Sequence, residues 1–89
     1  MSDTEVTGIL DAERKALVKQ IVCDVLEVEP AELGEADDFV EQHEADSLAG
    51  LTILATLERD LHIELAQEEL ERMTNLAGVY AVVAEAESR

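Results

Sequence analysis

Aromatic residues are nearly absent from the sequence. One phenylalanine, one tyrosine and no tryptophan occur among its 89 residues, whereas 47% of the residues are hydrophobic. The core must therefore consist of Leu, Ile, Val and Ala, which form a soft and adaptable interior. A chain of this length closes only one modest core, so we expect a single domain without a deep enzyme pocket.

Basic residues are also few. Six Lys and Arg residues stand against 22 Asp and Glu residues, which gives a formal net charge of −16. This charge repels nucleic-acid phosphates and anionic lipid headgroups, so neither is an expected partner. Protein partners should instead present basic patches. The apolar residues recur at regular spacing, so the charge is not interpreted as a sign of disorder.

Cysteine occurs once, at Cys23, which excludes a disulfide within the chain and fits a reducing compartment. The sequence has no charged start followed by the apolar run of a signal peptide. It also has no stretch near the ~18 apolar residues of a membrane span. Together these features predict a cytoplasmic location.

Helical periodicity begins at residue 11 and predicts a first helix that ends near residue 27. Its apolar stripe consists of Leu17, Val18, Ile21, Val22, Val25 and Leu26. Residues 29–45 contain Pro30 and Gly34 and lack sustained periodicity, which predicts a long irregular connection. The expected anchors of this connection to the core are Leu33, Phe39 and Val40.

Asp46 is the expected N-cap of a second helix, although Gly50 within it costs up to about 1 kcal/mol relative to Ala. The apolar stripe of this helix is Leu48, Leu51, Leu54, Leu57 and Leu61. Residues 67–72 predict one or two helical turns. Thr74 or Asn75 then caps a last helix through Ala84. Its expected core residues are Leu76, Val79, Tyr80 and Val83.

The predicted fold is an all-α four-helix bundle. It has three main helices, one short helix and a long loop after the first helix. We expect residues 1–10 to be a loose lead, residues 11–84 to form the folded domain, and residues 85–89 to be a frayed C-terminus.

The segment E-A-D-S-L, residues 44–48, places Ser47 in the first turn of the second helix. A phosphate ester at this serine would lie at the positive end of the helix dipole, which favours an anion by a few tenths to about 1 kcal/mol. The simpler interpretation is that Asp46 and Ser47 only start a helix, since both residue types are common there. The tripeptide D-S-L alone favours that simpler interpretation.

The wider sequence resembles the acyl carrier protein family over roughly residues 11–84. The matching run is D-D-F-V-E-Q-H-E-A-D-S-L-A-G-L-T-I-L-A-T-L-E-R-D-L-H-I-E-L, followed by Q-E-E-L-E-R-M-T-N-L. The resemblance implies a four-helix bundle and a 4'-phosphopantetheine arm, derived from coenzyme A, on Ser47. Two positions depart from the family pattern, because Glu44 replaces a glycine and His43 replaces a leucine. Both lie in the loop before the serine.

The resemblance also implies which residues contact partner enzymes. They are Asp46, Leu48, Thr52, Glu58 and Asp60. Thr52 stands where an acidic residue is frequent, and Arg59 adds a positive charge, which favours discrete polyketide or related specialised biosynthesis. The implied partners are a phosphopantetheinyl transferase, a ketosynthase, and an acyltransferase or ligase. The carrier itself is expected to be monomeric and non-catalytic.

Other chemistry is poorly supported by the residues. Cys23, His43 and His62 show no motif of a catalytic pair. The acidic residues between 35 and 44 lack the spacing of a calcium loop, so no metal site is expected. The alternatives left open are a housekeeping fatty-acid carrier, an aminoacyl carrier, and an unmodified acidic helical adaptor that binds a basic protein surface.

Overall fold

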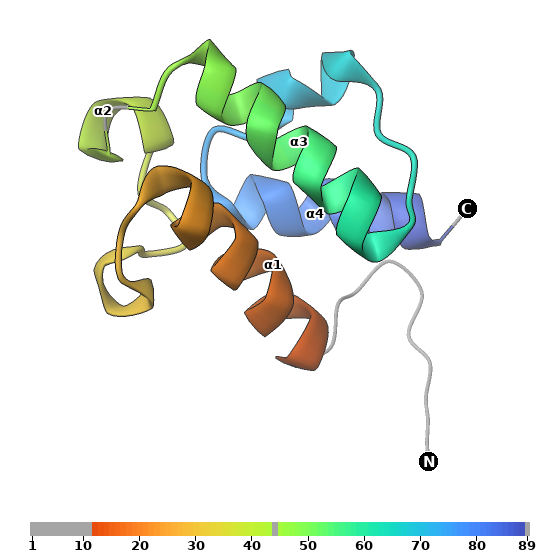
Figure 1. Cartoon of the computed structure of the whole chain (residues 1–89), viewed down its shortest axis with the longest axis horizontal. Helices are drawn as coiled ribbons and strands as arrows, with labels where there is room; N and C mark the ends of the chain where they lie inside the picture. Colours follow the sequence, from red (N-terminus) through yellow and green to blue (C-terminus); the bar gives the residue numbers. More distant parts are fainter. Residues whose placement is uncertain (1–11, 44, 89) are drawn as a thin grey trace.

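The computed structural model describes residues 12–43 and 45–88, and these residues form helices and loops without a strand. Three long helices are α1 (Ala12–Leu26), α3 (Ser47–Leu61) and α4 (Leu76–Glu87). Three shorter helices are η1 (Pro30–Glu32), α2 (Phe39–His43) and η2 (Gln67–Arg72). The prediction of an all-α bundle is confirmed. Figure 1 shows α1 and α3 lying side by side, with α4 passing behind α3 and α2 at one end of the molecule.

The core lies between the three long helices, since α1 contacts both α3 and α4. In α1 the predicted residues Val18, Ile21 and Val22 are buried, but Leu17 is 40% exposed. Cys23, which lies outside the predicted stripe, is only 1% exposed. Each fully buried Val, Leu or Ile contributes about 1.5–3 kcal/mol of transfer free energy. The remaining buried residues come mainly from α3 and α4 and include Ile53, Leu54, Leu57, Leu61, Leu76, Val79, Val82 and Val83.

The apolar stripe predicted for α3 is wrong at its N-terminal end. Leu54, Leu57 and Leu61 are buried as predicted, whereas Leu48 is 69% exposed and Leu51 is 36% exposed. A helix has 3.6 residues per turn, so Leu48 lies about one and two-thirds turns before Leu54 and faces another direction. The start of α3 therefore presents leucine side chains to the surface.

The connection between α1 and α3 is more ordered than the sequence predicted, because it contains η1 and α2. Asp38 starts α2, since its Oδ1 accepts hydrogen bonds from the backbone N–H groups of Val40 (2.9 Å) and Glu41 (3.0 Å). The Gln42 side chain accepts a hydrogen bond from the Asp38 N–H at 2.7 Å. These local side-chain bonds, rather than apolar periodicity, produce the five-residue helix.

Two of the three predicted anchors of this connection are confirmed. Leu33 and Phe39 are buried, but Val40 is 61% exposed, because the short α2 helix turns it away from Phe39. Backbone hydrogen bonds also join the connection to the start of α4. Phe39 N–H donates to the Thr74 carbonyl at 2.9 Å, and Ala77 N–H donates to the Glu35 carbonyl at 3.1 Å.

Asn75 is the N-cap of α4, with its Oδ1 accepting a hydrogen bond from Gly78 N–H at 2.8 Å. Tyr80, expected in the core, is half-buried. The helix continues through Glu87, three residues beyond the predicted end at Ala84, so residues 85–87 of the expected frayed end are helical. The expected lead at residues 1–10 lies outside the described residues.

The short helix η2 has the predicted position at residues 67–72. Its last residue, Arg72, binds both carboxylate oxygens of Glu85 on α4, at 2.8 and 2.5 Å. Arg72 also contacts Glu69 at 3.3 Å. The paired guanidinium fixes η2 against α4.

Candidate functional site

Ser47 is the first residue of α3, and its side chain is exposed. Asp46 is the N-cap, as predicted, and its Oδ1 accepts a hydrogen bond from Ala49 N–H at 2.9 Å. The backbone N–H groups of Ser47 and Leu48 belong to the first turn, which has no preceding helical carbonyls to bind. A hydroxyl at this position is therefore rigidly held, open to solvent and close to the positive end of a fifteen-residue helix.

The loop before Ser47 is closed by polar contacts of its own. His43 Nε2 lies 3.3 Å from Asp37 Oδ2, and the same oxygen accepts a hydrogen bond from Gly34 N–H at 3.0 Å. Ala45 N–H then donates to the Phe39 carbonyl at 3.0 Å, directly before the N-cap. The histidine that departs from the family pattern thus has a structural partner, whereas Glu44 lies outside the described residues.

A pocket of about 770 Å³ adjoins Ser47. It lies between α2, α3 and η2, and its lining includes Val40, Ala45, Ser47, Gly50, Leu51, Ile53, Leu70 and Met73. Gly50 contributes to this space because it has no side chain, and a Cβ atom built there would meet only Leu70 Cδ2, at 3.6 Å. Sequence reasoning missed the pocket, and the only signal of it was the glycine inside an otherwise helical pattern.

The structure separates the predicted partner-contacting residues into different roles. Leu48 is exposed, while the Thr52 hydroxyl donates to the Leu48 carbonyl at 2.8 Å. Glu58 accepts a hydrogen bond from Leu65 N–H at 2.9 Å and so stabilises the turn after α3. Asp60 lies 3.0 Å from Arg59 Nε. Glu58 and Asp60, the two acidic residues predicted at the end of α3, therefore interact with other residues of this chain.

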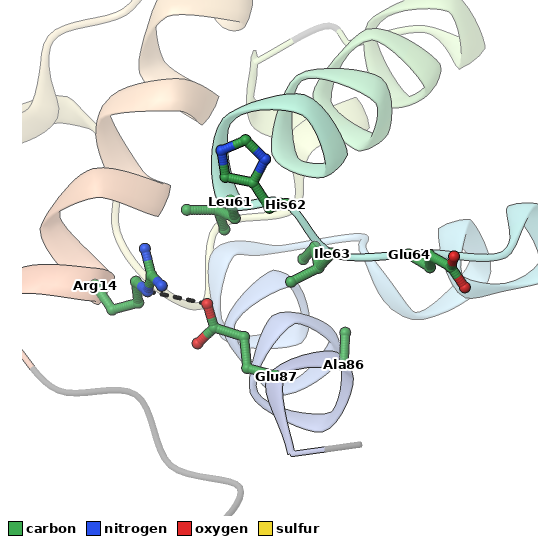
Figure 2. Close-up of a pocket in the computed structure, with 7 residues that line it drawn as sticks. All are labelled: Arg14, Leu61, His62, Ile63, Glu64, Ala86 and Glu87. Atoms are coloured by element: carbon green, nitrogen blue, oxygen red, sulfur yellow. Dashed lines mark ion pairs between the residues drawn. The ribbon is translucent and has the colours of Figure 1, made fainter.

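A second pocket, of about 670 Å³, lies at the opposite end of α3. Figure 2 shows Arg14 reaching from α1 to Glu87 on α4, with a distance of 2.9 Å between Nε and Oε2. His62 terminates α3 in a left-handed conformation (φ 57°) and points away from this ion pair. The fifteen residues of α3 extend over roughly 20 Å, so this pocket is separate from Ser47.

The residues considered for other chemistry lie on different elements. Cys23 is buried in α1, and burial raises the pKa of its thiol. His43 belongs to α2 and contacts Asp37, whereas His62 is exposed after α3. Residues 12–43 and 45–88 contain no cluster of three His, Cys, Asp or Glu side chains arranged to hold a metal ion. Within the same residues, no helix is both long and apolar enough to cross a membrane.

A small all-α domain with an exposed serine at the start of a long helix, beside an apolar pocket, has the arrangement of a covalent carrier domain. Residues 16–83 match the family described as phosphopantetheine attachment site. The chain is 54% identical over 77 residues to polyketide-8 synthase acyl carrier protein 1 of Streptomyces avermitilis, covering 86% of this chain and 92% of the relative.

Two further relatives are more distant. The chain is 36% identical over 83 residues to polyketide-8 synthase acyl carrier protein 2 of Streptomyces avermitilis, covering 93% of this chain and 91% of the relative. It is also 36% identical over 62 residues to the acyl carrier protein of Wolinella succinogenes, covering 70% and 82%. The chain belongs to the acyl carrier protein family, and its function is that of a carrier with a covalent 4'-phosphopantetheine arm. The resemblance inferred from the sequence is confirmed.

Proposed function

We propose that the phosphopantetheine arm is attached to Ser47 and that the protein holds polyketide intermediates as thioesters on this arm. The placement of Ser47 carries the first part of the proposal. Its hydroxyl is exposed at the N-terminus of α3, where a phosphate ester is electrostatically favoured. Ser88, the other serine among the described residues, follows α4 and donates its hydroxyl to the Ala84 carbonyl at 2.9 Å. A helix C-terminus disfavours an anion.

The polyketide assignment rests on the two Streptomyces relatives, whose names place them in a polyketide synthase. Identity to the first of them is higher, and extends over more of the chain, than identity to the Wolinella protein. The proposed partners are a phosphopantetheinyl transferase, a ketosynthase and an acyltransferase or ligase, and the chain contributes no catalytic residue to their reactions. Tethering supplies each partner with substrate at an effective concentration in the millimolar range. A cytoplasmic location and a monomeric state stay predictions.

The pocket beside Ser47 is proposed to shelter the part of the cargo nearest the protein. Its volume of about 770 Å³ lies within the usual range for small-molecule sites. Gly50→Leu should place a side chain in the pocket while α3 stays helical. Hydrolysis of a bound thioester, followed by intact mass, should then become faster. The matched control is Ala55→Leu at an exposed position of α3. Equal hydrolysis rates in both variants and in the wild type would exclude shelter in this pocket.

The attachment site is tested by incubating the protein with coenzyme A, magnesium and a broad-specificity phosphopantetheinyl transferase. Intact mass should show one added phosphopantetheine, and peptide mapping should place it on Ser47. Ser47→Ala should abolish the mass gain and keep the helical circular dichroism, because Asp46 still caps the helix. Ser88→Ala, the matched control, should be modified like the wild type.

Two outcomes would contradict the proposal in different ways. Unmodified wild type, in a reaction that fully converts a known carrier, would remove the carrier function and favour the acidic adaptor. Modification of folded Ser47→Ala would keep the carrier function but assign the arm to another residue.

A further inference from the structure

Basic residues are concentrated on α1. The whole chain has six Lys and Arg residues, and three of them, Arg14, Lys15 and Lys19, lie in this helix. Glu13 and Asp24 are its only acidic residues, so α1 has a net positive charge. In each of the other five described helices, acidic residues outnumber Lys and Arg. The chain therefore has one locally positive helix, although its formal net charge is −16.

The two lysines of α1 differ from the described arginines in their partners. Arg14, Arg59 and Arg72 each form an ion pair with a carboxylate. Within the described part of the chain, neither Lys15 nor Lys19 forms one. The two lysines are four positions apart and therefore lie on the same side of α1. In a chain with 22 acidic residues, this side of α1 keeps two positive charges that a carboxylate of another molecule can bind.

Lys15 connects this side of α1 to α4. Its Nζ lies 5.5 Å from the centre of the Tyr80 ring, and this cation–π contact leaves the ammonium without a carboxylate partner. Tyr80 is half-buried, and burial, followed by the negative charge of Glu35, raises the pKa of its hydroxyl. Glu35 is thus the acidic neighbour of Tyr80, and its carbonyl accepts the hydrogen bond from Ala77 N–H at the start of α4. It marks one border of the surface.

The outer side of α4 next to Tyr80 is uncharged. Charged residues make up 31% of the chain, yet none occurs among residues 73–84. Ala77 and Ala81 are exposed, and they share one side of α4 because they are four positions apart. Residues 76–84 contain no polar side chain apart from the Tyr80 hydroxyl. A helix that is apolar on all sides is normally buried on all sides, so the exposed side of α4 has the composition of a covered surface.

These observations define one surface, which consists of Lys15, Lys19, Ala77, Tyr80 and Ala81, and we call it the α1–α4 face. We propose that the α1–α4 face is a docking surface for a partner protein that presents carboxylates around a small apolar area. The choice of partner rests on charge complementarity with the two lysines. An apolar centre with a charged border is also the usual composition of a protein interface. This partner differs from the basic partners expected from the net charge.

The charge of the whole chain argues against other anionic occupants. Nucleic acids and anionic membranes present an extended negative charge, which the net charge of −16 repels over the whole surface of the protein. A protein can instead present a few carboxylates at one place. In a twofold dimer of this chain the same face would contact itself, which would bring the lysines of both copies together. A heterologous acidic protein therefore fits the face best.

The α1–α4 face is formed by other residues than the site at Ser47. The pocket beside Ser47 is lined by residues of α2, α3 and η2 and of their adjoining loops, and none of the five residues of the face belongs to it. A partner on the face therefore leaves Ser47 accessible to enzymes. Such a partner would keep the carrier close to the enzymes that it accompanies and so raise their effective concentration.

Heteronuclear NMR of the isotope-labelled protein, titrated with a random copolymer of glutamate and tyrosine, tests the proposal. This copolymer is the probe because it offers carboxylates beside apolar rings. Amide shifts should change at the α1–α4 face and stay constant at Ser47. Lys15→Gln combined with Lys19→Gln should weaken binding by about fivefold, as expected for the loss of two exposed charge pairs. Added salt should also weaken it.

Two matched controls separate charge from other effects. Lys15→Arg combined with Lys19→Arg keeps both charges and should bind the copolymer like the wild type. Arg59→Gln removes a positive charge that is already paired with Asp60 and should also bind like the wild type. Thermal midpoints establish that every variant is folded at the temperature of the titration.

Several results would overturn the proposal. One is the absence of shift changes with the copolymer, and another is a set of changes centred on Ser47 or on any other surface. Equal affinity of the wild type and the double glutamine variant would exclude a role of the lysines. Shift changes at the face with anionic phospholipid vesicles or duplex DNA, and none with the copolymer, would assign a different partner class. A dimer in sedimentation velocity that Ala81→Glu dissociates would show that a second copy covers the face.

Failure of this proposal is distinguishable from failure of the proposed function. The titration is carried out on the unmodified protein and does not depend on the phosphopantetheine arm. Modification of Ser47 without binding of the copolymer would reject the docking surface and keep the carrier function. Binding of the copolymer at the α1–α4 face without modification of Ser47 would do the reverse.

Discussion

The imidazole of His43 lies 3.3 Å from the carboxylate of Asp37, measured from Nε2 to Oδ2. This contact spans six residues and closes the loop that leads to Ser47. The same carboxylate accepts a hydrogen bond from Gly34 N–H, and this bond, followed by the contact with His43, holds the pKa of Asp37 below its ordinary value. We call the contacts among His43, Asp37 and Gly34 the polar clasp. At position 43 the family pattern has an apolar leucine instead.

The clasp predicts a dependence of stability on pH. Because the pKa of Asp37 is lowered in the folded state, its contribution is complete above the ordinary Asp value of about 3.9 and is lost as the pH falls through the folded value. Asp37→Asn should lower the thermal midpoint at neutral pH, and this midpoint should fall less than that of the wild type as the pH drops below about 4. His43→Gln keeps the bond to Gly34 and should show an intermediate profile. Identical profiles for Asp37→Asn and the wild type would contradict the clasp.

The two helical glycines should respond in opposite directions to alanine. A Cβ atom at Gly50 meets only Leu70 Cδ2 at 3.6 Å, so Gly50→Ala should stabilise the fold by up to about 1 kcal/mol through helix propensity. A Cβ atom at Gly78 would lie 1.9 Å from the Arg72 carbonyl oxygen, so Gly78→Ala requires backbone movement and should destabilise by about 1–3 kcal/mol. Urea denaturation of both variants measures the two changes. A stabilised Gly78→Ala would show that α4 and η2 are not so closely packed.

Two substitutions at Asp46 separate the effect of its capping hydrogen bond from the effect of its negative charge. Asp46→Ala removes the acceptor for Ala49 N–H and should cost about 1 kcal/mol of unfolding free energy. Asp46→Asn keeps an acceptor of nearly equal capping strength, so its stability should stay within a few tenths of a kcal/mol of the wild type. Equal losses in both variants, measured by denaturant titration, would mean that the charge stabilises α3 and the cap does not.

Glu58 was expected to contact partner enzymes, but its hydrogen bond to Leu65 N–H predicts a structural role. Glu58→Ala should lower the unfolding free energy by about 1–3 kcal/mol, the cost of leaving a donor unpaired next to buried Leu65. Glu58→Gln retains an acceptor oxygen and should recover more than half of that loss. Hydrogen exchange of the Leu65 amide gives a local measurement, and equal exchange rates in the wild type and Glu58→Ala would contradict this role.

The three long helices and the position of Ser47 follow from short-range information. Apolar spacing identifies the helices, and the pair Asp46 and Ser47 identifies the start of α3 with its cap. The helix α2 was missed because five residues are too few to show periodicity. Its signal was Asp38 followed by Gln42, whose side chains bind the backbone at the start of that helix.

Exposure of Val40, Leu48 and Leu51 could not be predicted from hydrophobicity. An apolar side chain is normally assigned to the core, and only the packing of distant elements shows that these three lie outside it. The same holds for Glu58, whose hydrogen-bond partner is seven residues away beyond the end of its helix. Three of the wrongly predicted core residues, Val40, Leu48 and Leu51, thus lie near Ser47, at the candidate functional site.

The two backbone hydrogen bonds from the α1–α3 connection to Thr74 and Ala77 have a consequence for the order of events during synthesis. Thr74 and Ala77, which complete the loop before Ser47, leave the ribosome about 30 positions later and lie at the start of α4. A nascent chain that has exposed only Ser47 and the rest of α3 therefore lacks these two hydrogen bonds. The loop before Ser47 therefore reaches its final shape only after Thr74 and Ala77 have been synthesised.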